Sequence, residues 1–113
     1  PMKTFLALFM GSPGRAPGPG DMSPEDMQRG MAAWGAWMET HAASIVDPAG
    51  PVGVTKCVSQ RGVEDIRNQV GGYVVVRAGS LEAAARMFEG HPHFTIFPGD
   101  RVEIMERLPA PGA

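Results

Sequence analysis

Two segments of this chain are apolar on both faces of a β-strand, and this pattern limits the folds that it can adopt. Residues 4–10 read TFLALFM, and residues 72–77 read GYVVVR. Because successive side chains of a strand point to opposite faces, each of these strands needs apolar cover on both sides. The sheet that contains them must therefore be packed on each face.

Two amphipathic helices are predicted. Ser23 and Pro24 are typical of a helix start, and apolar or aromatic residues then recur every three or four positions, which predicts a helix over 24–43. A second helix is expected over 81–89, with Ser80 as its cap, Leu81 on its inward face and Gly90 as its stop. Asp47-Pro48 and Gly50-Pro51 predict an irregular segment between the first helix and the next strand.

Further strands are predicted over 52–59 and 101–108, which gives the order β-α-β-β-α-β in a single domain of 113 residues. This order predicts an α+β, ferredoxin-like fold, an antiparallel sheet with both helices on one face. The other face has no element of this chain to cover it. A second copy packed sheet against sheet is the economical solution, so a homodimer is predicted.

Glycine and proline together account for 26 of the 113 residues, and seven of them lie in residues 11–20. A flexible loop is therefore predicted over 11–22, and a loose tail over 109–113. The loop lacks the glycine spacings of phosphate-binding loops. It is interpreted either as a plain connector or as a lid over a cavity, with Arg15 as an anion contact.

Composition excludes several classes of protein. Ten basic and twelve acidic residues give a net charge of −2, which argues against a nucleic-acid partner. The single cysteine, Cys57, excludes an internal disulfide and favours a cytoplasmic location. The apolar run at the N-terminus is too short for a membrane span and is interpreted as a strand instead of a signal peptide.

Six short segments, in their order and spacing, resemble the YCII-related family of dimeric α+β barrel proteins. In chain order they are Met31-Ala32-Ala33-Trp34-Gly35-Ala36-Trp37, Val46-Asp47-Pro48 with Pro51-Val52-Gly53, Gly71-Gly72-Tyr73, Leu81-Glu82-Ala83-Ala84, His91-Pro92-His93 and Val102-Glu103-Ile104. The Asp-Gly-Pro-Phe motif of many relatives is absent, and residues 64–68 stand in its place. The resemblance implies a dimer with a small cavity between sheet and helices. It implies no single activity, since similar folds host several enzymes and binding proteins.

His93 and His91 are the candidate catalytic residues. An imidazole titrates near neutral pH and suits general acid–base work, and His93 matches the family's Pro-His position. The alternative is that His93 bonds a backbone carbonyl and only fixes the loop. A metal site is not predicted, because none of the spacings of metal motifs is present.

The candidate ligand-binding residues are Trp34, Trp37, His41, Tyr73 and Glu103. The two tryptophans are more often core residues in such a position, and His41 is more often a core residue or a partner of the helix end. Glu103 is interpreted as the partner of Arg77 or Arg101 in an ion pair, or else as a carboxylate that assists His93.

Two functions stay open at this point. The first is a small-molecule enzyme that needs no cofactor and uses His93 as its acid–base group. The second is a non-catalytic dimer that binds a small ligand or has a structural role. No cofactor motif is present in the chain.

Overall fold

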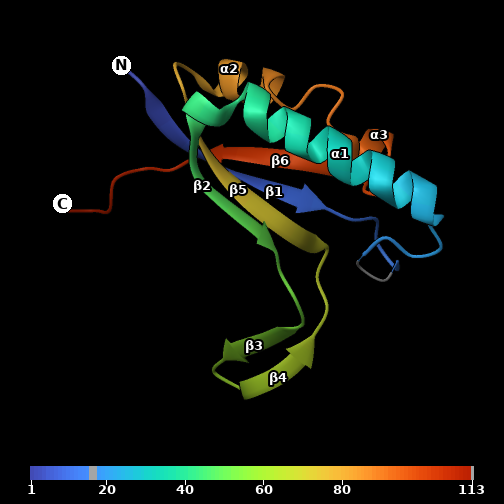
Figure 1. Ribbon diagram of the computed structural model, residues 1–113. Coiled ribbons are helices and arrows are strands. Elements are labelled where there is room, and N and C mark those ends of the chain that lie inside the picture. The colour runs from blue at the N-terminus through green and yellow to red at the C-terminus, as the bar shows by residue number, and fades with distance from the viewer. Residues whose placement is uncertain (16–17, 113) are drawn as a thin grey trace.

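One four-stranded antiparallel sheet with helices packed on it forms the body of the protein (Figure 1). The computed structural model describes residues 1–15 and 18–112. In chain order the elements are β1 (Lys3–Met10), α1 (Pro24–Thr40), the 3-10 turn η1 (Ala42–Ser44), β2 (Ile45–Pro51), β3 (Thr55–Ser59), β4 (Gly62–Ile66), β5 (Val70–Ala78), α2 (Leu81–Arg86), α3 (Pro92–Thr95) and β6 (Arg101–Glu106). The chain is thus a mixed α+β protein, as the sequence predicts.

The sheet has the strand order β2-β5-β1-β6. The two strands that are apolar on both faces, β1 and β5, occupy the centre and pair with each other in antiparallel register. β6 pairs with β1 on one side, and β2 pairs with β5 on the other. The central position agrees with their sequences. Side chains on both faces of a central strand are more completely covered by neighbouring elements than those of an edge strand.

Local capping explains where the helices begin. The Ser23 side chain accepts a hydrogen bond from the Asp26 backbone N–H at 3.1 Å, with Pro24 in the first turn. The Ser80 side chain does the same for the Ala83 N–H at 3.0 Å. Both caps confirm the predicted helix starts.

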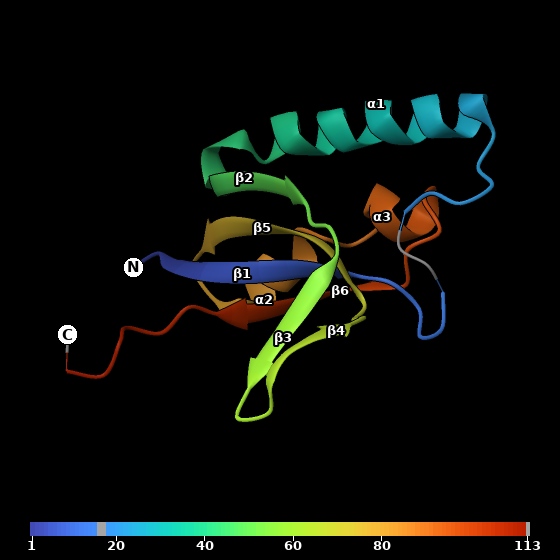
Figure 2. The same ribbon diagram turned by 90° about the horizontal axis from the view of Figure 1, so that it is seen from below.

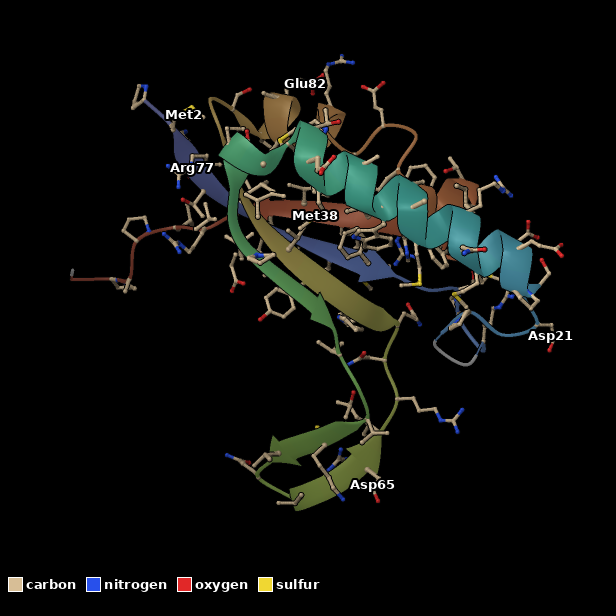
Figure 3. All side chains as sticks on the ribbon, viewed as in Figure 1. Met2, Asp21, Met38, Asp65, Arg77 and Glu82 are labelled. Atoms are coloured by element: carbon tan, nitrogen blue, oxygen red, sulfur yellow. The ribbon has the colours of Figure 1, made fainter. Side chains whose placement is uncertain are left out.

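The core lies between the sheet and the helices. The alternate residues Phe5, Ala7 and Phe9 of β1 are buried there, next to those of β5. α1 runs above the sheet in Figure 1 and alongside the edge strand β2 in Figure 2, and Met38 lies on the sheet side of this helix (Figure 3). The indole of Trp37 is the largest buried side chain of α1, and its N–H donates to the Met87 carbonyl at 2.8 Å.

A strand does form within 52–59, but the prediction that it is the second strand of the main sheet was wrong. The strand that joins the sheet is β2, which runs through Asp47-Pro48 and Gly50-Pro51, the segment expected to be irregular. β2 is an edge strand whose pairing with β5 shifts register twice. Proline and bulges are tolerated at sheet edges, because one side of an edge strand donates no ladder hydrogen bonds.

The predicted strand over 52–59 is instead part of a separate hairpin. β3 pairs only with β4, which lies in the segment expected to be a polar connection. The hairpin projects away from the main sheet (Figure 1), with Asp65 on β4 opposite Lys56 of β3 (Figure 3). Several of its apolar side chains lie in solvent, and Val58 is 74% exposed.

Smaller differences concern the helices. α1 ends at Thr40, and a 3-10 turn takes up the rest of the predicted span. α2 is shorter than predicted, and Leu81, expected to point inward, is 50% exposed at its first position. The short helix α3 was not predicted. Residues 16 and 17 of the predicted loop and residue 113 of the predicted tail lie outside the described residues.

Candidate functional site

A cavity of about 490 Å³ opens at one end of the sheet, beneath α1. Its wall combines the end of β1, the end of β2, the start of β5, the middle of α1 and the loops that follow β1 and α3. The lining residues are Phe9, Gly11, Ser12, Arg15, Gly18, Pro19, Met31, Trp34, Gly35, Met38, Pro48, Gly50, Pro51, Asn68, Gln69, Gly71, Gly72, Tyr73, Val74, His93, Phe97, Pro98 and Gly99. A volume of this size is typical of sites for small organic molecules.

His93 lies in the cavity wall, and one of its ring nitrogens is tied to the backbone. Its Nε2 is 2.8 Å from the carbonyl oxygen of Met10. Because a carbonyl oxygen only accepts, Nε2 carries the proton and donates it to this bond. In the neutral ring the lone pair is therefore on Nδ1, which has no hydrogen-bond partner among the residues that the structure describes. The fixed tautomer leaves Nδ1 as the nitrogen that a ligand can meet.

Gly99 holds the ring of His93 in place by having no side chain. A Cβ at this position would lie 2.2 Å from the ring of His93, so the imidazole rests directly on the glycine backbone. The backbone N–H of Gly99 also donates to the carbonyl of His93 at 2.9 Å. Next in the chain, Asp100 donates its N–H to the same Met10 carbonyl at 2.9 Å. Hydrogen bonds to the Met10 carbonyl thus connect the loop after α3 to the end of β1.

His91 is fully buried and does not reach the cavity wall. Its Nδ1 accepts the backbone N–H of His93 at 3.0 Å and so caps α3. The ring packs against Phe9, Trp34 and Trp37, with ring centroids about 5 Å apart. Its Nε2 has no hydrogen-bond partner within the described structure.

Burial explains the electrostatic state of His91. Desolvation, followed by the proximity of His93 and His41, lowers the pKa of His91 to about 4. The ring is therefore neutral at physiological pH. It positions His93, because its hydrogen bond fixes the turn from which the His93 side chain departs.

A small polar network lies next to the His93 loop. The Asp100 carboxylate accepts from Arg101 at 2.8 Å and from the Ser12 hydroxyl at 3.3 Å. The bond from Arg101 is the main reason that the pKa of Asp100 is lowered. Because Ser12 lines the cavity, this network connects the loop after β1 with the loop that carries His93.

Arg15 borders the cavity from a tight turn. Residues 12–15 form this turn, in which the Arg15 N–H donates to the Ser12 carbonyl at 3.2 Å. Pro13 and Gly14, with φ of +77° at the glycine, suit the two central positions of a type II turn. The described part of the predicted lid therefore does lie beside a cavity.

The two tryptophans of α1 have different places. Trp34 lines the cavity, with its ring centroid 4.8 Å from that of Phe9 and 5.9 Å from that of Phe97. Trp37 lies in the core and not in the wall. His41 stacks on Trp37 at the end of α1, 4.8 Å between centroids, also outside the wall.

The two remaining candidates are on strands. Tyr73 borders the cavity, but its neighbour Val74 is the residue buried against the helices, so the Tyr73 side chain points to the opposite sheet face. Glu103 lies away from the cavity and accepts a hydrogen bond from the Arg101 Nε at 2.7 Å. The predicted ion pair with Arg101 is therefore confirmed.

Sequence reasoning missed two parts of the site. These are the Met10 carbonyl and Gly99, which together orient His93. Only the Pro98-Gly99 turn signal marked the second in the sequence, and nothing marked the first. Within residues 1–15 and 18–112, no cluster of three His, Cys, Asp or Glu side chains is arranged to hold a metal ion. None of the described helices is both long and apolar enough to cross a membrane.

Comparison with solved structures shows a likeness in fold. The structure is similar to that of the 5-chloro-2-hydroxyhydroquinone dehydrochlorinase of Burkholderia phenoliruptrix AC1100, solved with 2,5-dihydroxybenzoquinone. The TM-score is 0.54, the sequence identity is 19%, and the match covers 90% of each chain. At this level of identity the likeness shows that the two chains share a general α+β fold. No protein-family model and no curated sequence matches the chain.

Proposed function

We propose that the protein is a small-molecule enzyme of the YCII type that needs no cofactor and uses His93 as its general acid–base group. One observation carries the proposal. His93 lines a ligand-sized cavity with one nitrogen tied to the backbone and the other without a hydrogen-bond partner in residues 1–15 and 18–112. A histidine that only fixed the loop would need no cavity beside it and no free nitrogen.

The geometry suggests how the residue works. The Met10 carbonyl holds the Nε2 proton, and Gly99 supports the flat side of the ring. Nδ1 is then the base, which takes a proton from a substrate and returns it later in the reaction. Once Nδ1 is protonated, the Met10 carbonyl and Asp100, which is close enough to His93 for the two charges to interact, stabilise the imidazolium.

The structural likeness supports the same type of chemistry. The dehydrochlorinase acts, by its name, on a small aromatic compound. Removal of HCl from such a compound is a reaction that a positioned base assists. The proposal for this chain is limited to proton transfer on a small molecule.

The test begins with a thermal-shift screen of small molecules, since a ligand that binds only the folded protein raises its Tm. Each compound that binds is then incubated with the wild type, with His93→Gln and with Glu39→Gln as a matched surface control. The Gln side chain retains a nitrogen donor for the Met10 carbonyl but has no base at the Nδ1 position. Turnover should fall at least about 100-fold in His93→Gln, the lower end of a general-base contribution. Full turnover in His93→Gln would overturn the proposal.

The alternative function is a non-catalytic dimer that binds a small ligand. In that case compounds would raise the Tm of the wild type and of His93→Gln alike, and none would be converted. The screen therefore separates the two functions with one set of proteins.

We also propose that the chain forms a homodimer with a ferredoxin-like protomer, in which the β3–β4 hairpin is an insertion. The sheet face opposite the helices carries Leu6, which pairs with Val75 on one side and Met105 on the other. These side chains form an apolar row across the three strands. A two-stranded hairpin is only marginally stable alone, so the exposed hairpin adds surface that a second copy would protect.

Sedimentation of the wild type and of Leu6→Lys tests the dimer. The wild type should sediment as a dimer at micromolar concentration, and Leu6→Lys as a folded monomer, because a buried unpaired ammonium is costly. A monomeric wild type would refute the proposal.

A further inference from the structure

The described residues of the cavity wall carry positive charge and no negative charge. Arg15 is a permanent cation, whereas the described residues of the wall include no aspartate or glutamate. The chain as a whole has a net charge of −2, so a basic composition does not explain this. The other polar groups of the wall, among them Asn68, Gln69 and the N–H-bearing ring of His93, carry no negative charge either.

The position of Arg15 is set by the fold. The turn over 12–15 places it, and the Ser12 hydroxyl anchors that turn to Asp100. The Gly11 N–H adds a second anchor through its 2.7 Å bond to the carbonyl of Gln69. Arg15 itself makes no ion pair with any described residue. The turn fixes only the backbone of Arg15, and its exposed guanidinium, at the edge of the cavity and with no carboxylate partner among the described residues, is available to a ligand.

The shape of the wall favours a flat ligand. The rings of Phe9, Trp34 and Phe97 follow one another along the wall, with His93 next to them at 5.3 Å from Phe9. Aromatic rings offer faces and edges on which another ring packs well. The nearby glycines of the wall leave room for it because they have no side chains.

We propose that the cavity binds a small planar aromatic carboxylate, or a conjugated anion of the same shape, and that Arg15 pairs with its negative charge. The inference rests on the proposed use of this cavity as the ligand site. It goes further by naming the class of ligand and the residue that selects it. A carboxylate offers two oxygens to the guanidinium, while the ring packs on Trp34 and leaves the region of His93 for the reacting part.

The experiment compares charged ligands with neutral ligands of the same shape. The probes are benzoate with benzamide, cinnamate with cinnamamide, and 2-naphthoate with 2-naphthamide, titrated by calorimetry into the wild type, Arg15→Gln, Arg15→Lys and Arg29→Gln. Arg29 is an exposed arginine of α1 outside the cavity wall and serves as the matched control.

At least one carboxylate should bind the wild type about tenfold or more tightly than its amide, which corresponds to about 1.4 kcal/mol. Arg15→Gln should abolish this preference, Arg15→Lys should retain part of it, and Arg29→Gln should leave it unchanged. Added salt should weaken binding of the carboxylate and not of the amide.

Three results would overturn the inference: equal binding of a carboxylate and its amide, a preference that survives Arg15→Gln, or no binding of any probe up to millimolar concentration. Each of these leaves the role of His93 untouched, since the titrations measure no turnover. Loss of turnover in His93→Gln with no preference for anions would refute the ligand class and support the enzyme.

Discussion

Acid should destabilise this protein through one residue, His91. The ring is 0% exposed, and its pKa is lowered from 6.5 to about 4 in the folded protein. In the unfolded chain the ring is free in water and titrates near 6.5. Between these two pH values the unfolded chain binds a proton that the folded chain does not bind. The stabilisation is therefore fully present above pH 6.5 and is lost as the pH falls toward 4.

The size of the effect follows from the difference between the two pKa values. That difference is about 2.5 pH units, at about 1.4 kcal/mol for each unit, which gives about 3.5 kcal/mol of unfolding free energy in total, about 3 kcal/mol of it lost by pH 4. A domain of this size is stable by about 5–15 kcal/mol. The loss is thus a large part of the total.

The assay is urea denaturation of the wild type and of His91→Asn at several pH values between 7.5 and 4. The oxygen of Asn can still accept the His93 N–H, so the cap of α3 is retained while the titrating ring is removed. Carboxylates titrate in both proteins and cancel in the difference. The stability advantage of the wild type should shrink by about 3 kcal/mol from pH 7 to pH 4. A difference that is constant with pH would refute the reasoning, and His91→Phe, which also cannot titrate, should behave as His91→Asn does.

Three further substitutions test the packing of the site and the core. Gly99→Ala would place a Cβ 2.2 Å from the His93 ring, so we expect the ring to move. The NMR resonances of the ring should shift and the free energy of unfolding should fall by about 1–3 kcal/mol. Unchanged resonances would contradict this. Trp37→Phe removes the donor to the Met87 carbonyl and should lower the free energy of unfolding, measured by urea denaturation, by about 1–3 kcal/mol. An unchanged urea midpoint would show that water replaces the bond. Gly35→Ala should raise the free energy of unfolding by about 1 kcal/mol, because alanine favours a helix and no atom lies within 4 Å of the new Cβ. A loss of stability would indicate a contact that the structure does not show.

The existence of most elements could be predicted from the sequence, but not which strands pair. The alternation of Val54, Lys56 and Val58 with Thr55 and Cys57 correctly indicated a strand there. It could not indicate that this strand pairs with its neighbour in a hairpin instead of with β5. The alternation of side chains indicates which face of a strand is apolar. It does not indicate the pairing partner, because that depends on the rest of the fold.

The candidate site shows the same limit on a smaller scale. In the sequence His91 and His93 lie two residues apart, and only the family resemblance favours His93. In the structure His91 caps a helix of four residues and turns into the core, while His93, inside that helix, faces the cavity. This separation depends on the Met10 carbonyl and on Gly99, which lie 83 residues before His93 and six after it. Backbone groups carry no signal in the sequence, so no pattern could have located the first of them.

The high glycine and proline content explains why a cavity is found at this end of the sheet. Of the 23 described residues in its wall, eleven are glycine or proline. At Gly72 a Cβ would lie 3.0 Å from the Gly50 carbonyl, so glycine is what allows β5 and the end of β2 to approach each other closely. Gly35 is kept inside a helix, where glycine costs about 1 kcal/mol relative to alanine, although its position has room for a side chain. Gly99, which also lines the cavity, leaves space for the ring of His93 because it has no side chain. The composition that lowers the stability of the regular elements therefore leaves open the volume on which a small-molecule function depends.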